Sequence, residues 1–301
     1  MRALATCLAL LVALVVAACG GDGAKPSPNG PAPVRIGTKN FTESEILGEL
    51  YAQALRAKGM PVMLEPSVGS TEVINAALRD GLLDMYPEYV GVLLSEVDKV
   101  DPRPDDPTAA YRLAKRLEER RDFTLLQPTR LSNENALAVR QSFARRRGVR
   151  SIPDLRRLRG DERLGVSPEF RTRFEGLVGL ARRYGLRSIR TKVVDVAGGK
   201  QYPQLDDGRL AAAVVFTTDS QLAGGRYLLL DDPKRLFEAQ HVAPLISRKV
   251  LARHGPVLAA TLDAVSALLT TPVMQKLNAK AAKGASAQRV ADEFLRQNAL
   301  K

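Results

Sequence analysis

From residue 34 onward, short apolar runs alternate with segments in which apolar residues recur at helical spacing. Three of the runs read as strands, at residues 34–37, 61–64 and 82–85. We expect the helix after the first strand to begin at Thr42, with Glu45 completing a capping box, and to end at Gly59. We expect the next helix to open at 69–71 and to stop at 80–81. This β-α-β-α-β order predicts a parallel sheet with helical crossovers.

The same rhythm starts again further along the chain, after a loop at 101–107 and a helix at 108–120. The further strands that we expect are 123–126, 136–139, 164–166, 189–194, 211–216 and 227–230. A continuous helix is expected from about Arg171 to Tyr184, and the last sixty residues are helical by periodicity. Two α/β units and a helical tail predict an α/β protein with two lobes.

The N-terminus has the pattern of an export signal. A charged Arg2 precedes an apolar run at 8–16 that is too short to span a bilayer. The run ends in Val-Ala-Ala-Cys19, which resembles the bacterial lipobox, and a Gly/Pro/Ser-rich tether follows at 20–33. We expect residues 1–18 to be a lipoprotein signal peptide and Cys19 to carry lipid. The protein would then be extracytoplasmic and anchored to the membrane. The alternative is an ordinary signal peptide with a chance cysteine.

Charge and cysteine content exclude some classes of function. The 301 residues carry a formal net charge of +12, and segment 140–192 holds sixteen Lys and Arg against five acids. Because an export signal precedes it, we interpret the segment as a solvated basic face near anionic envelope lipids and expect no nucleic-acid partner. Two isolated histidines, and one cysteine after cleavage, give no cluster with metal-ligand spacing. We expect no metal and no cofactor.

Seven segments occur in the order and spacing of one known family. They are GTKNFTESEILGELY (37–51), GSTEV (69–73), LRDGLLDMYPEYVG (78–91), NALAVR (135–140), SPEFRTRFEGLVGLARRYG (167–185), VVFTTDS (214–220) and LLDDP (229–233). The chain resembles the substrate-binding proteins of ABC importers for glycine betaine, choline, carnitine and related osmoprotectants. The resemblance implies a two-lobed type II periplasmic-binding fold, each lobe a mostly parallel sheet flanked by helices. The implied lobes are 34–132 plus 239–301, and 133–238.

Two basic residues fit the carboxylate end of such a ligand. Lys39 and Asn40 follow the first strand and precede a helix, where parallel α/β lobes bind ligands. The resemblance implies that Lys39 and Arg173 meet the ligand's carboxylate, and an Arg fork suits this role. Solvated surface side chains are the alternative for both. The 69–71 turn suits an anion or is a plain helix cap.

The cation end departs from the family pattern. The resemblance implies a cage of four aromatic rings, whose positions fall here at Tyr89, Asn135, Phe216 and Gln240. Two rings are therefore replaced by amides, which predicts a small zwitterion or carboxylate whose other end carries N–H or O–H donors. Tyr86 is expected to pack in the core, and Asn133 and Asp219 to lie at the mouth of the site. Asp219 is expected to cap the next helix, and the alternative is that it opposes a cationic end of the ligand.

The sequence leaves two other functions open. A lipoprotein that senses or presents a ligand without an importer would look the same, because docking surfaces for a permease have no short motif. An envelope enzyme is a remote alternative, since no G-x-S-x-G, CxxC, HExxH or P-loop pattern occurs. The resemblance implies a binding protein rather than an enzyme, with permease and ATPase subunits as partners.

Overall fold

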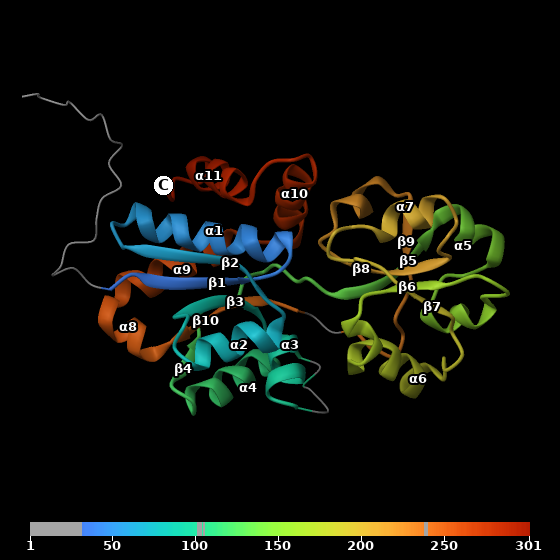
Figure 1. Ribbon diagram of the computed structural model, residues 1–301, viewed down its shortest axis with the longest axis horizontal. Helices are drawn as coiled ribbons and strands as arrows, with labels where there is room; N and C mark the ends of the chain where they lie inside the picture. The colour runs from blue at the N-terminus through green and yellow to red at the C-terminus, as the bar shows by residue number, and fades with distance from the viewer. Residues whose placement is uncertain (1–31, 101–103, 105, 238–239) are drawn as a thin grey trace, which may run out of the picture. The chain divides into compact units, whose positions relative to one another are not determined.

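The computed structural model describes residues 32–100, 104, 106–237 and 240–301. The expected signal peptide, Cys19 and the tether as far as residue 31 lie outside these residues, as does most of the 101–107 loop. The described chain contains two five-stranded sheets with helices on both sides of each (Figure 1). We call each sheet with its helices a lobe, in the order of their first strands.

The first lobe is built on a mixed sheet of order β2-β1-β3-β10-β4. Its strands are β1 (Val34–Lys39), β2 (Val62–Gly69), β3 (Met85–Tyr89), β4 (Phe123–Leu125) and β10 (Val242–Ser247). β1 pairs in parallel with β2 and β3, whereas β10 runs antiparallel to β3 and β4. The prediction that the last sixty residues are helical was therefore wrong at β10, which is buried between two strands.

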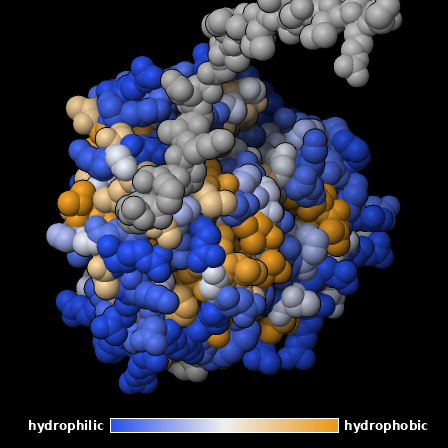
Figure 2. All heavy atoms as spheres, turned by 60° about the vertical axis from the view of Figure 1, so that its left-hand side comes forward, coloured by the Kyte–Doolittle hydropathy of each residue, from blue (hydrophilic) through white to orange (hydrophobic). Residues whose placement is uncertain are grey.

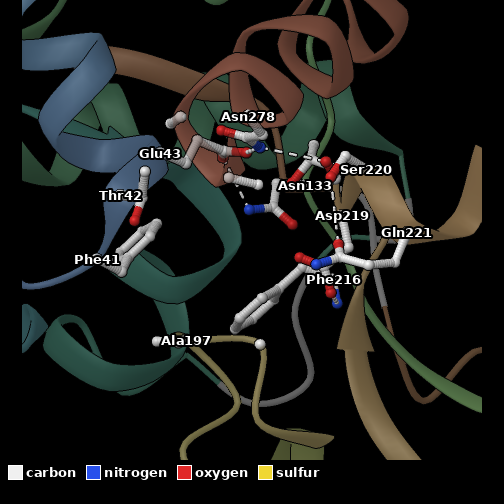
Figure 3. Close-up of a pocket in the computed structure, with 15 residues that line it drawn as sticks. Phe41, Thr42, Glu43, Asn133, Ala197, Phe216, Asp219, Ser220, Gln221 and Asn278 are labelled. Atoms are coloured by element: carbon white, nitrogen blue, oxygen red, sulfur yellow. Dashed lines mark hydrogen bonds between the residues drawn. The ribbon is translucent and has the colours of Figure 1, made fainter. Parts of the chain in front are cut away.

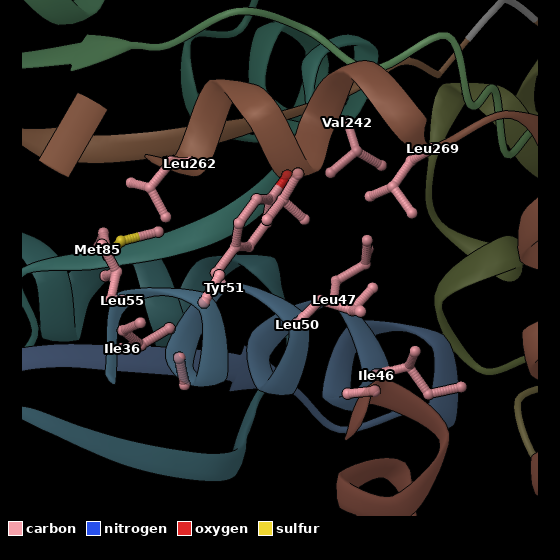
Figure 4. Close-up of a cluster of buried hydrophobic side chains, with 14 of the residues drawn as sticks. Ile36, Ile46, Leu47, Leu50, Tyr51, Leu55, Met85, Val242, Leu262 and Leu269 are labelled. Carbon is pink, nitrogen blue, oxygen red and sulfur yellow. The ribbon is translucent and has the colours of Figure 1, made fainter. Parts of the chain in front are cut away.

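Helices cover both faces of this sheet (Figure 1). They are α1 (Thr42–Ala57), α2 (Thr71–Arg79), α3 (Val90–Val92) with the π-turn Leu93–Val97, α4 (Pro107–Glu119), α8 (Arg248–His254), α9 (Pro256–Leu268), α10 (Thr271–Ala282) and α11 (Ala287–Gln297). Figure 4 shows the core between α1 and α9, where Leu47, Leu50 and Tyr51 of α1 pack with Leu262 of α9. The Tyr51 hydroxyl hydrogen-bonds to Ser266 Oγ at 2.9 Å, so this buried ring keeps its polar group paired.

The second lobe has the sheet order β7-β6-β8-β5-β9. Its strands are β5 (Asn135–Arg140), β6 (Leu164–Val166), β7 (Thr191–Val193), β8 (Ala212–Phe216) and β9 (Tyr227–Leu229). Its helical segments are α5 (Gln141–Arg147), Ile152–Arg157, Glu169–Arg171, Phe174–Val178, α6 (Gly179–Tyr184), α7 (Gln201–Asp206) and Ser220–Gly224. The predicted strands of this lobe are confirmed, with small shifts at their ends.

The chain passes between the two sheets twice, and the two connections pair with each other. Ser132 and His241 form an antiparallel bridge. The Asn133 N–H donates to the Gln240 carbonyl at 3.2 Å, and the Gln240 N–H donates to Ser132 Oγ at 3.0 Å. Residues from both connections are therefore held beside each other where the lobes join.

Two local predictions in the first lobe were wrong. The third strand spans Met85–Tyr89 rather than 82–85, and Pro87 lies opposite Pro244 in its ladder. Every second antiparallel pair exchanges no hydrogen bonds, so two facing prolines fit there without losing any. The expected capping box at Thr42 is absent, because Phe41 is the N-cap and the Glu45 carboxylate accepts instead from the Ser67 hydroxyl.

The face of the molecule shown in Figure 2 is mostly hydrophilic, with a group of hydrophobic residues near its centre. The large hydrophobic residues that are exposed in the described chain are Met63, Val73, Leu82, Val193, Leu229 and Val257. Among the residues that the structure describes, no helix combines the length and the apolar character needed to cross a bilayer.

Candidate functional site

A cavity of about 300 Å³ collects most of the residues singled out in the sequence. Its lining includes Lys39, Asn40, Tyr89, Asn133, Asn135, Arg173, Phe216 and Gln240. Three of these stand at strand ends: Lys39 closes β1, Tyr89 closes β3 and Phe216 closes β8. Parallel α/β lobes present their ligand-binding loops at this edge. Both lobes therefore contribute side chains to one cavity.

Lys39 lies in the wall of this cavity as a buried cation. Its side chain forms an ion pair with Glu88, and its Nζ lies 5.0 Å from the centroid of the Tyr89 ring. Burial lowers the pKa of Lys39, and the Glu88 carboxylate opposes this shift. Glu88 also accepts from the Tyr86 hydroxyl at 2.9 Å, which confirms that Tyr86 packs in the core. The Lys39 charge is thus held in a fixed place by the first lobe.

Arg173 reaches the same cavity from the second lobe. Its Nη2 lies 3.2 Å from Glu72 Oε1 and its Nε lies 3.7 Å from Glu96 Oε2. Burial raises the pKa of Glu72, but hydrogen bonds from the Ser70 hydroxyl and its own backbone, together with Arg173, leave it below its usual range. The Arg173 side chain keeps a quarter of its surface exposed. Its guanidinium is therefore accessible from the cavity while it is oriented by acids of the first lobe.

The aromatic wall has two rings beyond the predicted Tyr89 and Phe216, namely Phe41 and Phe170. Phe41 stacks on Phe216 with ring centroids 6.5 Å apart, and it lies 5.8 Å from Tyr89. The prediction of a cage reduced to Tyr89 and Phe216 therefore omitted Phe41. Phe41 could have been predicted as a site residue, because it follows Lys39-Asn40 directly at the end of a strand. Tyr89 itself is nearly buried, and Lys39 lies over its ring.

The two amides at the remaining cage positions converge on one carboxylate, that of Glu175. Gln240 Nε2 lies 3.2 and 3.4 Å from the two Glu175 oxygens, and Asn135 Nδ2 lies 3.4 Å from Oε2. Gln240 Oε1 accepts from the Val92 N–H at 2.9 Å, which fixes the orientation of its amide. Glu175 is buried and lines the cavity. Its place in the site was not predicted from the sequence.

Glu175 reaches the cavity because the helix expected over 171–184 is broken. A 3₁₀ turn ends at Arg171, non-helical backbone angles follow at Glu175 and Gly176, and α6 starts at Gly179. A Cβ on Gly176 would lie 2.0 Å from the Phe170 carbonyl oxygen. This close approach requires glycine, and it turns the preceding carboxylate inward.

A second cavity of about 170 Å³ shares Phe41, Asn133 and Phe216 with the lining of the first, and Figure 3 shows the residues around it. Within it, the buried Glu43 carboxylate accepts from the Tyr89 hydroxyl and from Asn133 Nδ2, both at 2.8 Å, and from Asn278 Nδ2 at 2.9 Å. Asn133, expected at the mouth of the site, is instead buried against Glu43, because its amide offers the carboxylate a hydrogen bond.

Asp219 lines this second cavity across from Glu43 (Figure 3). Its Oδ2 accepts from the Tyr202 hydroxyl at 2.6 Å and from the Phe216 N–H at 3.0 Å. Asp219 stands at the N-cap of the helical turn Ser220–Gly224, as expected, but its side chain forms no cap hydrogen bond there. Burial raises the pKa of Asp219 to about 6.

The remaining candidate residues make fewer contacts in the cavity. Asn40 is exposed at the rim of the larger cavity. The Ser70 hydroxyl donates to Glu72 at 2.6 Å, and Ser70 is the N-cap of α2 without a side-chain cap bond. No group of three or more His, Cys, Asp or Glu within the described ranges could hold a metal ion. The larger cavity thus offers two cations, four rings and one buried carboxylate for binding.

Comparison with known proteins gives a consistent result over most of the chain. Residues 32–297 match the OpuAC family model, the substrate-binding domain of ABC-type glycine betaine transport systems. A glycine-betaine-binding protein of Pseudomonas aeruginosa is 33% identical over 277 residues, which cover 89% of this chain and 88% of the relative. The glycine betaine-binding protein YehZ of Escherichia coli is 31% identical, with 88% and 90% covered.

Solved structures agree with the sequence comparison. The apo structure of YehZ from Escherichia coli superimposes with a TM-score of 0.67 at 29% sequence identity, covering 90% of this chain and all of the other. A glycine betaine/carnitine/choline ABC transporter structure gives a TM-score of 0.73 at 24% identity, covering 89% and 99%. The two-lobed α/β fold is therefore shared.

Proposed function

The chain belongs to the OpuAC family of substrate-binding domains of ABC-type glycine betaine transport systems, and on this premise we propose which ligand it captures and where. It is a substrate-binding protein of an ABC importer for glycine betaine or a related osmoprotectant, of an extracytoplasmic family, and it is not an enzyme. Our proposal is that its ligand is a small zwitterion or carboxylate of the betaine class, bound between the two lobes.

One observation carries this proposal: the larger cavity pairs cationic side chains with aromatic rings. Lys39 and Arg173 supply positive charge for a carboxylate, and the Arg fork can form two parallel bonds to it. Phe41, Phe216 and Tyr89 supply ring faces for the positive end. Lys39 comes from the first lobe and Arg173 from the second, which supports a ligand position in an interlobe cleft.

We propose lobe boundaries at 34–132 plus 239–301, and 133–238. The sheet memberships support them, because β1 to β4 and β10 form one sheet and β5 to β9 the other. The paired connections at Ser132 and His241 would then act as the hinge when the cleft closes on the ligand. Small-angle scattering should give a smaller radius of gyration with bound ligand. An unchanged radius at saturation would contradict closure.

The lipobox supports a lipid anchor at Cys19, and the family supports permease and ATPase subunits as partners. Acyl chains stabilise membrane binding by about 0.8 kcal/mol for each buried CH₂, and the tether offers nothing comparable. The variant Cys19→Ser should therefore lose lipid labelling and leave the membrane fraction with its fold intact. Equal retention of variant and wild type would refute the anchor.

A thermal-shift screen of the domain from residue 32 tests the ligand class. Betaines, choline, carnitine and amino acids are the compounds to compare. A ligand at 100-fold over its Kd adds about 2.7 kcal/mol of stability, which gives a clear rise in Tm. We expect zwitterions to raise Tm and choline, which lacks a carboxylate, to raise it less. A screen in which choline is the strongest compound would contradict the roles given to Lys39 and Arg173.

A further inference from the structure

The cation end of the larger cavity contains a carboxylate where rings are expected. Two of the four cage positions carry amides, Asn135 and Gln240, and both donate toward Glu175. From this arrangement we propose that Glu175 makes the site select ligands whose ammonium group carries N–H over quaternary ammonium ligands. The inference rests on the proposed function, because it assumes that a zwitterion occupies this cavity.

The position of the Glu175 carboxylate is fixed from several sides. Gln240 can point only its Nε2 at Glu175, because its Oε1 accepts from the Val92 N–H at 2.9 Å. Gln240 is itself fully buried, and its amide packs where Gly91 has no side chain. On the other side, Gly176 allows the backbone to turn against the Phe170 carbonyl. These contacts hold the acid in place before a ligand arrives, so no reorganisation is needed on binding.

Hydrogen bonding gives this acid its selectivity. A quaternary ammonium has no N–H, so it offers a carboxylate only an unspecific attraction and prefers ring faces. Its methyl groups would also remove water from the buried carboxylate without replacing the lost hydrogen bonds, which is unfavourable. A primary, secondary or tertiary ammonium donates a charge-assisted bond instead. The same carboxylate therefore stabilises one class of ligand and disfavours the other.

The rings of this cavity give a quaternary group little compensation. Lys39 Nζ already lies 5.0 Å from the centroid of Tyr89, whose hydroxyl donates to Glu43. Phe41 and Phe216 stack on each other at 6.5 Å, which covers one face of each ring. Phe170, the fourth ring of the lining, is nearly buried and packs on Phe237 with ring centroids 6.1 Å apart. The aromatic surface left for a ligand cation is thus partial, and the buried acid becomes the main feature of that end.

Calorimetric titration with glycine, sarcosine, dimethylglycine and glycine betaine tests the inference. These compounds share the carboxylate end and differ in the number of N–H groups, from three to none. We expect wild type to bind dimethylglycine or sarcosine at least tenfold more tightly than glycine betaine. Glu175→Gln keeps the shape of the side chain and an oxygen that can accept from Gln240 Nε2. It should reduce this ratio to about one, because it weakens the binding of the ligands that carry N–H groups.

The matched control is Glu169→Gln, which removes an exposed acid from the lining of the same cavity and should leave the ratio unchanged. Glu175→Asp keeps the charge on a side chain that is shorter by one methylene. It should give an intermediate ratio if the carboxylate contacts the ligand's ammonium group directly. Circular dichroism spectra and Tm values are to be compared with wild type to check that each variant is folded. A wild type that prefers glycine betaine, or a ratio that survives in Glu175→Gln, overturns the inference and leaves the proposed function intact. If none of the four compounds binds, both are wrong.

Discussion

Arg173 Nη2 lies 3.2 Å from Glu72 Oε1, a contact that joins the second lobe to the first turn of α2 in the first. Glu72 is half-exposed, so the pair contributes little to the stability of the free protein. A ligand carboxylate in the cavity would meet the same guanidinium. We therefore expect Arg173 to act in binding far more than in folding.

The first prediction follows from this difference. Arg173→Ala should weaken binding of a zwitterionic ligand by about 2–5 kcal/mol, largely because the ligand carboxylate is left without its partner. Its effect on the free energy of unfolding of the free protein should stay below about 1 kcal/mol. Calorimetry and chemical denaturation measure the two quantities separately.

Arg171 is the control for this experiment, since it is exposed two residues away and does not line the cavity. Arg171→Ala should change binding by less than about 0.5 kcal/mol. Arg183 is a poorer control, because it bonds the Lys234 and Arg235 carbonyls and lies over Phe174. If Arg171→Ala loses affinity and Arg173→Ala does not, the carboxylate role of Arg173 is wrong.

The second prediction concerns the buried pair of Lys39 and Glu88. Removing one partner from a buried ion pair leaves a charge without compensation and typically costs about 3–5 kcal/mol. Lys39→Met should therefore destabilise the fold by that amount, as urea denaturation would show. Lys39→Met combined with Glu88→Gln should recover much of the loss, since the Tyr86 hydroxyl can still donate to the amide oxygen. A double variant no more stable than the single one would contradict a pair interaction.

Much of the fold was predictable because most of its strands can be recognised from the local sequence pattern. Residues 164–166 and the strand around 212–216 are short apolar runs between polar turns, and the structure confirms them. The cavity candidates were predictable for a related reason. Lys39 and Phe216 stand at strand ends, and this edge is where α/β lobes bind ligands.

The wrong predictions have a different origin, because they depend on tertiary contacts that the periodicity of the sequence does not encode. Periodicity favours a helix through Glu175 and Gly176, and only contact with the Phe170 carbonyl and with Gln240, 65 positions along, turns this segment. The third strand shifted for a similar reason, since its register is set by Ile36 and by Pro244. Local patterns contain no information about such pairings.

The third prediction tests the turn that carries Glu175. A methyl group at Gly176 would lie 2.0 Å from the Phe170 oxygen, so Gly176→Ala should force the backbone apart and cost about 1–3 kcal/mol of stability. It should also weaken ligand binding, since Glu175 moves with the turn. Gly224→Ala is the matched control, because nothing lies within 4 Å of the added Cβ and the backbone is not left-handed there. Equal Tm values for the two variants would contradict the steric argument.

The fourth prediction is a pH dependence set by Asp219. Burial raises its pKa in the folded protein to about 6, from an ordinary value of 3.8. Between these values the folded state binds more protons than the unfolded state, so the free energy of unfolding should fall as pH rises from about 4 to about 6. Above pH 6 the loss is complete. The nearby Glu43 carboxylate adds to the shift, and burial is its main cause.

Asp219→Asn should remove this contribution. The amide oxygen can still accept from the Tyr202 hydroxyl and the Phe216 N–H, which both bond to one oxygen of Asp219. The variant should therefore be more stable than wild type by about 1–3 kcal/mol at pH 7.5, since two pKa units correspond to about 2.7 kcal/mol. At pH 3.5 the two proteins should be nearly equal, because Asp219 is protonated in both states of the wild type. Denaturation at several pH values gives the difference curve, in which all other titrating groups cancel. A difference that does not change between pH 4 and 6 would mean that Asp219 titrates normally in the fold.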